Sequence, residues 1–204
     1  MQFYFVRHGQ SMGNMTNDYS TSAHDQLSPN GWQQAEQLVE RLAGIHFDAI
    51  YVSTATRTMQ TITPFLQRYG VRARLWPALQ EACWQHDRTT PVPLRAKPPA
   101  KFTMPPGEDA RFDILDKHQD LPHTNETYQE GRARVIGVYE HLMHWHRGRA
   151  ETILVVGHEH AGGRLVELLL GLDPEGRIKH SNSGLTHLTE RNDRIFQLKF
   201  ANRI

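Results

Sequence analysis

Two apolar runs that each end in a histidine constrain the fold of this chain most. Residues 152–156, Thr-Ile-Leu-Val-Val, carry no charge and stop at Gly157-His158. A continuous apolar run of this kind is typical of a parallel strand that is covered on both faces. Residues 2–6 form a second β-rich run, which stops at Arg7-His8-Gly9. Active sites of parallel sheets lie beyond the carboxyl ends of the strands, so we expect both histidines at one sheet edge.

The remaining periodicities predict strands that alternate with helices. Further strands are expected at 48–52, 72–76, 185–188 and 195–200, and helices at 28–43, 54–69, 124–147 and 161–170. Residues 10–27 are polar and are interpreted as a loop. This alternation predicts an α/β fold with a mostly parallel central sheet and helices on both faces.

Helix boundaries are marked by residues with a capping preference. Ser28 and Pro29 begin the first long helix, whose predicted buried face carries Trp32, Ala35, Leu38, Val39 and Leu42. Ser53 is the expected cap of the next helix, and Gly70 its end. The helix at 124–147 places Val135, Val138, Leu142 and Trp145 on one stripe.

Composition excludes several classes of protein. Among 204 residues, 23 Lys plus Arg and 22 Asp plus Glu give a net charge of +1, which argues against nucleic-acid or membrane-surface binding. The chain has one cysteine, Cys83, so no intrachain disulfide framework is expected. Its first residues read as a strand and not as a signal peptide, and we expect a cytoplasmic protein.

Residues 84–124 interrupt the α/β pattern. Seven of the eleven prolines lie here, namely Pro91, Pro93, Pro98, Pro99, Pro105, Pro106 and Pro122. We interpret the segment as a lid-like insertion in a single domain of residues 1–204, with one short helix near 108–117. Its basic residues, Arg88, Arg95, Lys97 and Lys101, either meet a second anionic group of a substrate or are solvated.

The three strand ends bring together residues that suit a phosphate group. Each of three predicted strands is followed by such residues: Arg7 and His8 after the first, Arg57 after the second, and His158 after the run at 152–156. Helix N-termini nearby add free N–H groups. The planar fork of arginine binds phosphate oxygens in pairs, and an imidazole can attack phosphorus. A leaving alkoxide also needs a proton, which Glu81 could supply after the third strand.

These residues resemble the histidine phosphatase superfamily, the phosphoglycerate-mutase-like fold. The matching pieces, in order, are Arg7-His8-Gly9 with Ser11 and Asn14, Leu27-Ser28-x-x-Gly31 with Gln34-Ala35, Arg57-Thr58-x-Gln60-Thr61, Leu79-x-Glu81, and Gly157-His158. Together they cover about 1–85 and 120–185. An Arg-His-Gly tripeptide alone is weak evidence, but its place after the first strand with every later piece in order is specific.

The resemblance implies a role for each matching residue. His8 is expected to be the nucleophile that becomes phosphohistidine, while Arg7, Arg57 and His158 clamp the phosphoryl group. Asn14 is expected to contact the phosphate or its loop, and Glu81 to act as general acid and then base. The resemblance implies no metal and no cofactor, and the expected partner is a small phosphorylated substrate, with the oligomeric state left open.

Three departures from the family pattern keep alternatives open. Thr54 stands where proline is usual, and Glu159 follows His158, where a distant branch of the superfamily places its acid. Glu159 is therefore an alternative proton donor. The mutase segment after the acid is absent, so we expect a phosphatase acting on phosphate monoesters of small metabolites. The alternatives are phosphoglycerate mutase-type phosphotransfer and a non-catalytic phosphate-binding protein.

The chain has 13 histidines, which invites a metal-site interpretation elsewhere. His141, His144 and His146 lie together on a predicted helix. No cysteine or close carboxylate completes a tetrahedral ligand set there, so a solvated helix face is expected.

Overall fold

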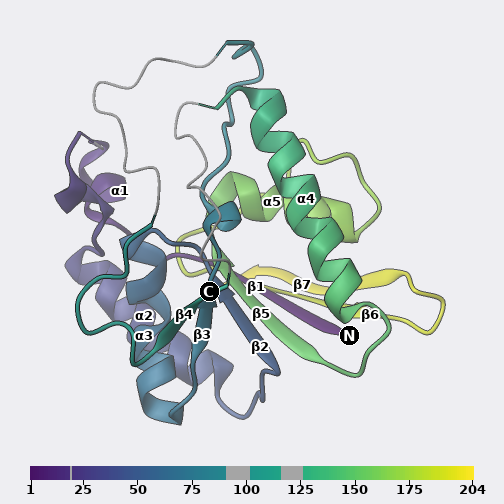
Figure 1. Ribbon diagram of the computed structural model, residues 1–204, viewed down its shortest axis with the longest axis horizontal. Coiled ribbons are helices and arrows are strands. Elements are labelled where there is room, and N and C mark those ends of the chain that lie inside the picture. Colours follow the sequence, from purple (N-terminus) through teal and green to yellow (C-terminus); the bar gives the residue numbers. More distant parts are fainter. Residues whose placement is uncertain (19, 91–101, 116–125) are drawn as a thin grey trace.

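A computed structural model describes residues 1–18, 20–90, 102–115 and 126–204 of the chain (Figure 1). The strands are β1 (Gln2–Arg7), β2 (Ala49–Val52), β3 (Ala73–Leu75), β4 (Phe112–Ile114), β5 (Thr152–Gly157), β6 (Leu185–Glu190) and β7 (Phe196–Arg203). The α-helices are α1 (Met12–Thr16), α2 (Pro29–Leu42), α3 (Thr56–Tyr69), α4 (Tyr128–His146) and α5 (Glu159–Leu169), with short 3-10 helices at Ser22–Asp25 and Pro77–Leu79.

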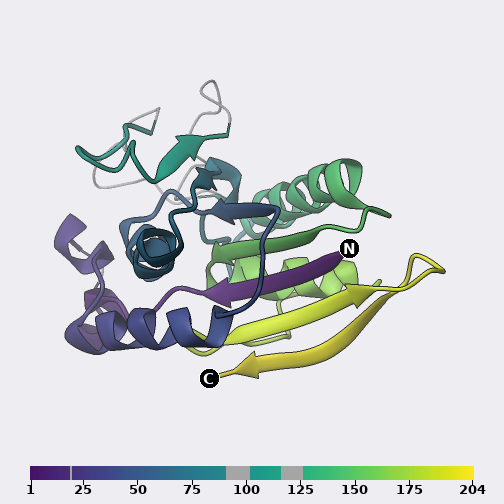
Figure 2. The same cartoon turned by 90° about the horizontal axis from the view of Figure 1, so that it is seen from below.

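In the described part of the chain the strands form one seven-stranded sheet in the order β4-β3-β2-β5-β1-β6-β7. The pairs from β4 to β1 are parallel, whereas β6 runs antiparallel to β1 and β7 antiparallel to β6. Figure 2 shows this order from teal β4 at the top to yellow β7 at the bottom. The expected mostly parallel α/β sheet is confirmed.

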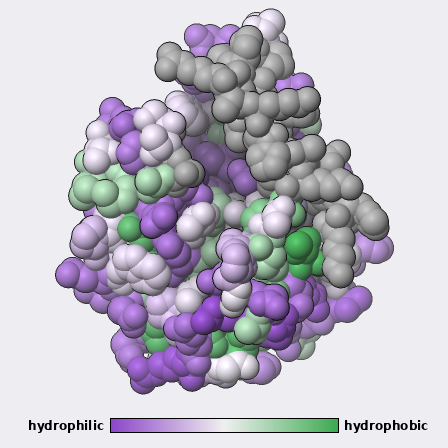
Figure 3. Space-filling model, turned by 60° about the vertical axis from the view of Figure 1, so that its left-hand side comes forward, coloured by the Kyte–Doolittle hydropathy of each residue, from purple (hydrophilic) through white to green (hydrophobic). Residues whose placement is uncertain are grey.

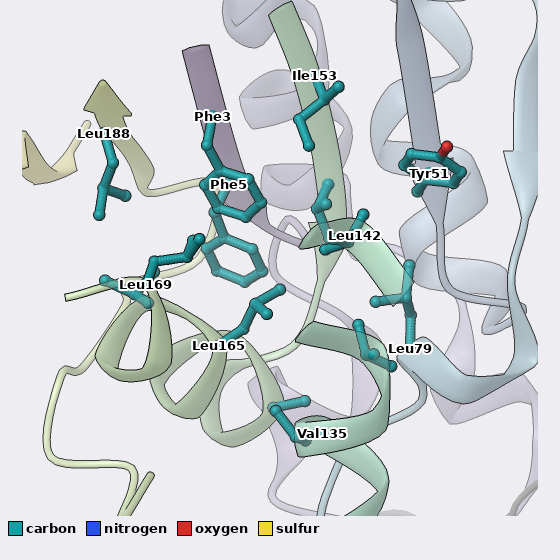
Figure 4. Packing of buried hydrophobic residues seen from close by; sticks show 14 of the residues in the cluster. Phe3, Phe5, Tyr51, Leu79, Val135, Leu142, Ile153, Leu165, Leu169 and Leu188 are labelled. Atoms are coloured by element: carbon teal, nitrogen blue, oxygen red, sulfur yellow. The ribbon is translucent and has the colours of Figure 1, made fainter. Parts of the chain in front are cut away.

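The central strand β5 is buried on both faces because its side chains alternate between two cores. Ile153 and Val155 pack with α4 and α5, whereas Leu154 and Val156 pack with α2 and α3. Figure 4 shows the first core, where Leu165 of α5 lies against the aromatic ring of Phe5. This two-sided burial explains why the run carries no polar alternation.

The capping residues predicted for α2 and the end of α3 are confirmed, with two corrections nearby. The Ser28 side chain accepts from the Gly31 N–H, and Gly70 ends α3 with a left-handed φ of 63°. Trp32, however, is 40% exposed, so its place on the buried face is wrong. Ser53 does not cap α3 either, because the helix begins at Thr56 and the Ser53 hydroxyl binds a histidine.

The interpretation of residues 10–27 as loop alone is wrong. The short helix α1 forms here because Ser11 and Asn14 make a reciprocal capping box. The Ser11 side chain accepts from the Asn14 N–H at 3.0 Å, and the Asn14 side chain accepts from the Ser11 N–H at 3.1 Å. A 3-10 turn follows at Ser22–Asp25.

The helix expected near 108–117 is wrong for residues 108–115. Phe112–Ile114 instead form β4, which pairs in parallel with β3 at the sheet edge. Phe112 is buried in the core, and the Arg72 guanidinium binds the Asp113 carboxylate at 2.6 Å, so packing and charge both favour the strand. Much of the predicted lid-like insertion, at 91–101 and 116–125, lies outside the described residues, as do Arg95, Lys97 and Lys101.

Among the helices of the described residues, none combines the length and the apolar composition that a membrane crossing requires.

Candidate active site

The parallel pairing of β1 with β5 sets the positions of the two candidate histidines. Arg7 lies opposite Gly157 in the register, and the His8 N–H donates to the Gly157 carbonyl at 2.9 Å. The loop after β1 then passes close to α2. A Cβ on Gly31 would lie 2.1 Å from the Gln10 carbonyl oxygen, so only glycine permits this approach.

The hydrogen bonds of His8 define which ring nitrogen is available for chemistry. Its Nδ1 lies 2.7 Å from the carbonyl oxygen of Gly9, and a carbonyl can only accept, so Nδ1 carries the proton. Arg57 Nε donates to His8 Nε2 at 3.2 Å, which requires a lone pair on Nε2. Both contacts select the neutral imidazole with Nε2 as its basic nitrogen.

Arg57 joins the two histidines. Its Nη2 donates to His158 Nδ1 at 3.0 Å, and the rings of His8 and His158 have centroids 5.3 Å apart. His158 is the N-cap residue of α5 and is fully buried. Segments from three parts of the sequence therefore meet at the carboxyl edge of the sheet.

The surroundings of both histidines favour the neutral ring. Burial, together with the positive charges of Arg57 and Arg7, holds the pKa of His8 well below its usual 6.5, although the bond to Gly9 opposes this. Burial and then the charge of Arg57 likewise hold the pKa of His158 well below 6.5. A desolvated imidazole beside guanidinium groups has no favourable place for a further proton.

Two residues of this site escaped the sequence analysis. The Asp25 carboxylate pairs with Arg57 Nη1 and also accepts from the Thr56 N–H at 2.7 Å. The Ser53 hydroxyl lies 2.8 Å from His158 Nε2 and orients that ring. Asp25 lies in a polar segment, and no motif in the sequence sets it apart from the other polar residues there. Serine is a common helix cap, so the sequence suggested that role for Ser53 and not its contact with His158.

Arg7 retains an unused donor beside the histidines. Its Nη1 donates to the His180 carbonyl at 2.6 Å and forms an ion pair with Glu159 at 2.8 Å. Its Nε is buried and finds no hydrogen-bond partner within residues 1–18, 20–90, 102–115 and 126–204. A buried guanidinium N–H without an acceptor is a feature that a bound anion would satisfy.

The two candidate proton donors have different partners. The Glu81 carboxylate accepts from the Ala161 N–H at 3.0 Å and from the His160 N–H at 3.4 Å, so it sits against the first turn of α5. Glu159 instead forms ion pairs with Arg7 at 2.8 Å and with Lys179 at 3.7 Å. Glu81 is thus fixed by backbone donors, and Glu159 is committed to two cations.

Asn14 lies in the loop network around His8. Its side-chain oxygen accepts from Asn182 Nδ2 at 3.2 Å, and the same Nδ2 is 3.2 Å from the His8 carbonyl oxygen. The Gly9 N–H also donates to the Thr61 hydroxyl at 2.9 Å. These contacts brace the backbone on both sides of His8.

The side of the molecule that carries α1 is mainly hydrophilic. Figure 3 looks onto this side and shows a recess lined by hydrophilic residues, with hydrophobic residues in small separate groups. Helix α1 follows directly from the end of β1, so the carboxyl edge of the sheet faces this way (Figure 1). An arrangement of two arginines and two neutral histidines can bind an anion and present a nucleophilic nitrogen to it.

Elsewhere in the part of the chain that the structure describes, the histidines form no metal-binding group. No group of three or more His, Cys, Asp or Glu side chains in the described residues could hold a metal ion. The solvated face expected for the α4 histidines is wrong for His146, which is only 7% exposed. Its ring lies between the Tyr51 hydroxyl at 2.9 Å and the Glu151 carboxylate at 2.7 Å.

Known proteins resemble this chain over nearly its whole length. A 2,3-bisphosphoglycerate-dependent phosphoglycerate mutase of Brucella anthropi is 30% identical over 184 residues, which are 88% of this chain and 87% of that protein. The α-ribazole phosphatase of Shigella flexneri has a similar fold, with a TM-score of 0.71 at 18% identity over 100% of this chain and 96% of that one. A mycobacterial glucosyl-3-phosphoglycerate phosphatase also has a similar fold, with a TM-score of 0.68 at 18% identity over 100% of this chain and 99% of that one.

The family profile described as histidine phosphatase superfamily (branch 1) matches residues 3–203. That match spans both histidines, both arginines and the sheet edge at which they meet. The chain therefore belongs to the histidine phosphatase superfamily.

Proposed function

We propose that this chain is a phosphatase that hydrolyses phosphate monoesters of small metabolites through a phosphohistidine at His8. The observation that carries the proposal is the state of His8: its Nδ1–H is held by the Gly9 carbonyl, and its basic Nε2 faces Arg57. A nucleophile must be unprotonated at the attacking atom, and this geometry selects that tautomer.

The anion site around His8 supports a phosphoryl substrate. Arg57 presents Nε and Nη2 to the two histidine rings, and the buried Arg7 Nε has no hydrogen-bond partner among the described residues. A phosphoryl group entering here accepts from these donors and releases Arg57 from His8 Nε2. Charge on the equatorial oxygens is then stabilised by fixed cations, which is the main requirement of phosphoryl transfer.

The chemical steps follow from these positions. His8 Nε2 attacks phosphorus, the bond from phosphorus to the leaving oxygen breaks, and protonated Glu81 gives its proton to that oxygen. Glu81 then takes a proton from water as the water oxygen attacks phosphorus, which releases inorganic phosphate and restores His8. We assign this role to Glu81 and not to Glu159, because Glu159 is bound to Arg7 and Lys179.

Covalent labelling tests the proposal. Brief incubation with a 32P-labelled monoester is expected to leave an acid-labile, base-stable phosphate on the parent protein. The His8→Ala protein is expected to take up no label and to lose turnover at least about 1,000-fold. His144→Ala, which removes an exposed histidine of α4, is the matched control and should label normally. Parent-like turnover of p-nitrophenyl phosphate by His8→Ala would refute the mechanism.

Mutase-type phosphotransfer is the second candidate, because curated relatives at 30% identity are named as phosphoglycerate mutases. A mutase returns the phosphoryl group of phosphohistidine to another hydroxyl, whereas a phosphatase gives it to water. Incubation with 3-phosphoglycerate and a trace of 2,3-bisphosphoglycerate distinguishes the two. We expect inorganic phosphate without isomerisation, and rapid formation of 2-phosphoglycerate would favour the mutase.

A non-catalytic phosphate-binding protein is the third alternative. It predicts that inorganic phosphate binds to the parent while no monoester in a broad panel is turned over. Turnover that depends on His8 excludes it.

A further inference from the structure

An aromatic stack with an exposed tryptophan lies close to Glu81 of the candidate active site. The rings of Trp84 and His160 have centroids 5.5 Å apart and planes inclined by only 19°. Trp84 is 56% exposed, although tryptophan is the largest apolar side chain. With one face of the indole on the imidazole, a large part of its surface remains open to a ligand.

Both members of the stack lie near Glu81, one in the sequence and one through a backbone contact. Trp84 follows it by three residues, and the backbone N–H of His160 points to Glu81 Oε2 at 3.4 Å. A proton donor must lie next to the leaving oxygen of the substrate. The group attached to that oxygen therefore emerges beside Glu81, whose carboxylate contacts the backbone of His160, one member of the stack.

The backbone around Trp84 is held by charged side chains that are buried or half-buried. Arg164, which is 1% exposed, donates to the Cys83 carbonyl at 2.7 Å and lies 4.4 Å from the centre of the Tyr128 ring. Arg134 donates to the Glu81 carbonyl at 3.0 Å, and Glu126 accepts from the Cys83 N–H at 3.1 Å. The indole is thus displayed on a fixed support, which lowers the entropy cost of binding.

We propose that the stack of Trp84 and His160 is the subsite for the leaving group, and that it selects monoesters whose leaving group carries a planar aromatic ring. This inference rests on the proposed phosphatase function and names the substrate class for it. Stacking recognises a flat conjugated ring with little dependence on its hydrogen-bonding groups. A saturated ring of the same size offers no such face.

Two esters with matched leaving groups test the subsite. Benzyl phosphate and cyclohexylmethyl phosphate both release a primary alcohol of similar size, and they differ in the planarity of the ring. Trp84→Ala is expected to lower kcat/KM for benzyl phosphate about tenfold, mainly through KM, and to change the saturated ester less than about twofold. Trp84→Phe should restore most of the loss. Trp32→Ala, at an exposed tryptophan of α2, should alter neither ester.

Binding to a catalytically inert protein separates the subsite from the chemistry. By calorimetry, His8→Ala should bind benzyl phosphate several-fold more tightly than the saturated ester, and the preference should vanish in His8→Ala/Trp84→Ala. Equal losses for both esters, or no effect of Trp84→Ala, would overturn the subsite while turnover that depends on His8 still supports the phosphatase. If the protein binds benzyl phosphate in preference to the saturated ester but the parent turns over neither, the subsite proposal stands and the phosphatase proposal is refuted.

Discussion

The two edges of the sheet each hold a buried histidine, and their surroundings differ. At the carboxyl edge, His8 faces a carbonyl on one nitrogen and the Arg57 guanidinium on the other. Toward the amino edge, His146 lies between the Glu151 carboxylate and the Tyr51 hydroxyl. The first ring has a cation beside its basic nitrogen, whereas the second has all its hydrogen bonds satisfied by a phenol and a carboxylate.

This comparison shows that burial does not by itself make a histidine reactive. His146 is as well packed as His8, yet both of its ring nitrogens have partners that complete a closed network. At His8 the partner of Nε2 is the Arg57 guanidinium, a cation that an anionic ligand would also bind. The charge beside the ring, and not burial, therefore distinguishes a candidate nucleophile from a structural histidine.

The largest expected difference between the edges concerns their carboxylates. Glu81→Gln should lower kcat for an alkyl phosphate by about 10²–10⁴, because the leaving alkoxide loses its proton donor. The loss should be much smaller with p-nitrophenyl phosphate, whose leaving group needs little protonation. Glu151→Gln, at the other edge, should leave kcat within about twofold. Steady-state kinetics with both esters measures this, and a greater loss in Glu159→Gln would transfer the role to Glu159.

The arginines give the next largest difference. Arg57→Gln should lower kcat/KM by about 10²–10³, because charge on the transferring phosphoryl group loses two donors. It should also raise the pKa of His8, since the charge of Arg57 helps to hold that pKa down. NMR titration of the imidazole reports the shift. Arg74→Gln is the matched control, because Arg74 lies near the Tyr51 ring, and parent-like activity in Arg57→Gln would contradict the assignment.

The dependence of stability on pH sharpens the comparison further. At the carboxyl edge, burial and then the charge of Arg7 lower the pKa of His180 to about 4. The folded state therefore resists protonation of this ring. The neutral ring's contribution to the free energy of unfolding is fully present above pH 6.5 and is lost as the pH falls toward 4. A shift of this size corresponds to about 3 kcal/mol. Urea unfolding between pH 7 and 4 should show a weaker dependence in His180→Gln, and an unchanged slope would refute the assignment.

The smallest expected effect lies at the amino edge. His146→Gln should lower the free energy of unfolding by about 1–3 kcal/mol, because the Tyr51 hydroxyl and the Glu151 carboxylate lose a buried partner. The activity should stay within about twofold of the parent. Thermal unfolding combined with steady-state kinetics measures both. A large loss of kcat at full stability would mean that the two edges are coupled.

Local signals in the sequence predicted most of the regular structure. The uncharged run before Gly157, the Ser28 cap and the Gly70 terminus all act within a few residues, so they can be read directly. Strand β4 escaped prediction because it has three residues and forms only by pairing with β3 from a proline-rich segment. Trp32 escaped because the helical period of α2 continues past the edge of the core it covers.

The residues of the candidate site likewise fall into those that the sequence predicted and those that it did not. The histidines and arginines stand at strand and helix ends, where parallel topology brings them together, so their meeting could be expected. Asp25 and Ser53 reach Arg57 and His158 through side-chain contacts between distant segments, which no local pattern encodes. Asn182 is a similar case, because its bond to the His8 carbonyl spans 174 residues of sequence.

Periodic apolar runs and their polar ends were sufficient to predict the central strands, the long helices and the sheet edge at which the candidate site lies. Tertiary packing decided which histidine has its basic nitrogen beside a guanidinium group, which carboxylate is held by backbone N–H groups and which tryptophan remains exposed. The reason is physical: secondary structure follows from interactions between near neighbours in the chain, whereas the protonation and hydrogen bonding of a buried group depend on every charge and dipole that folding brings beside it.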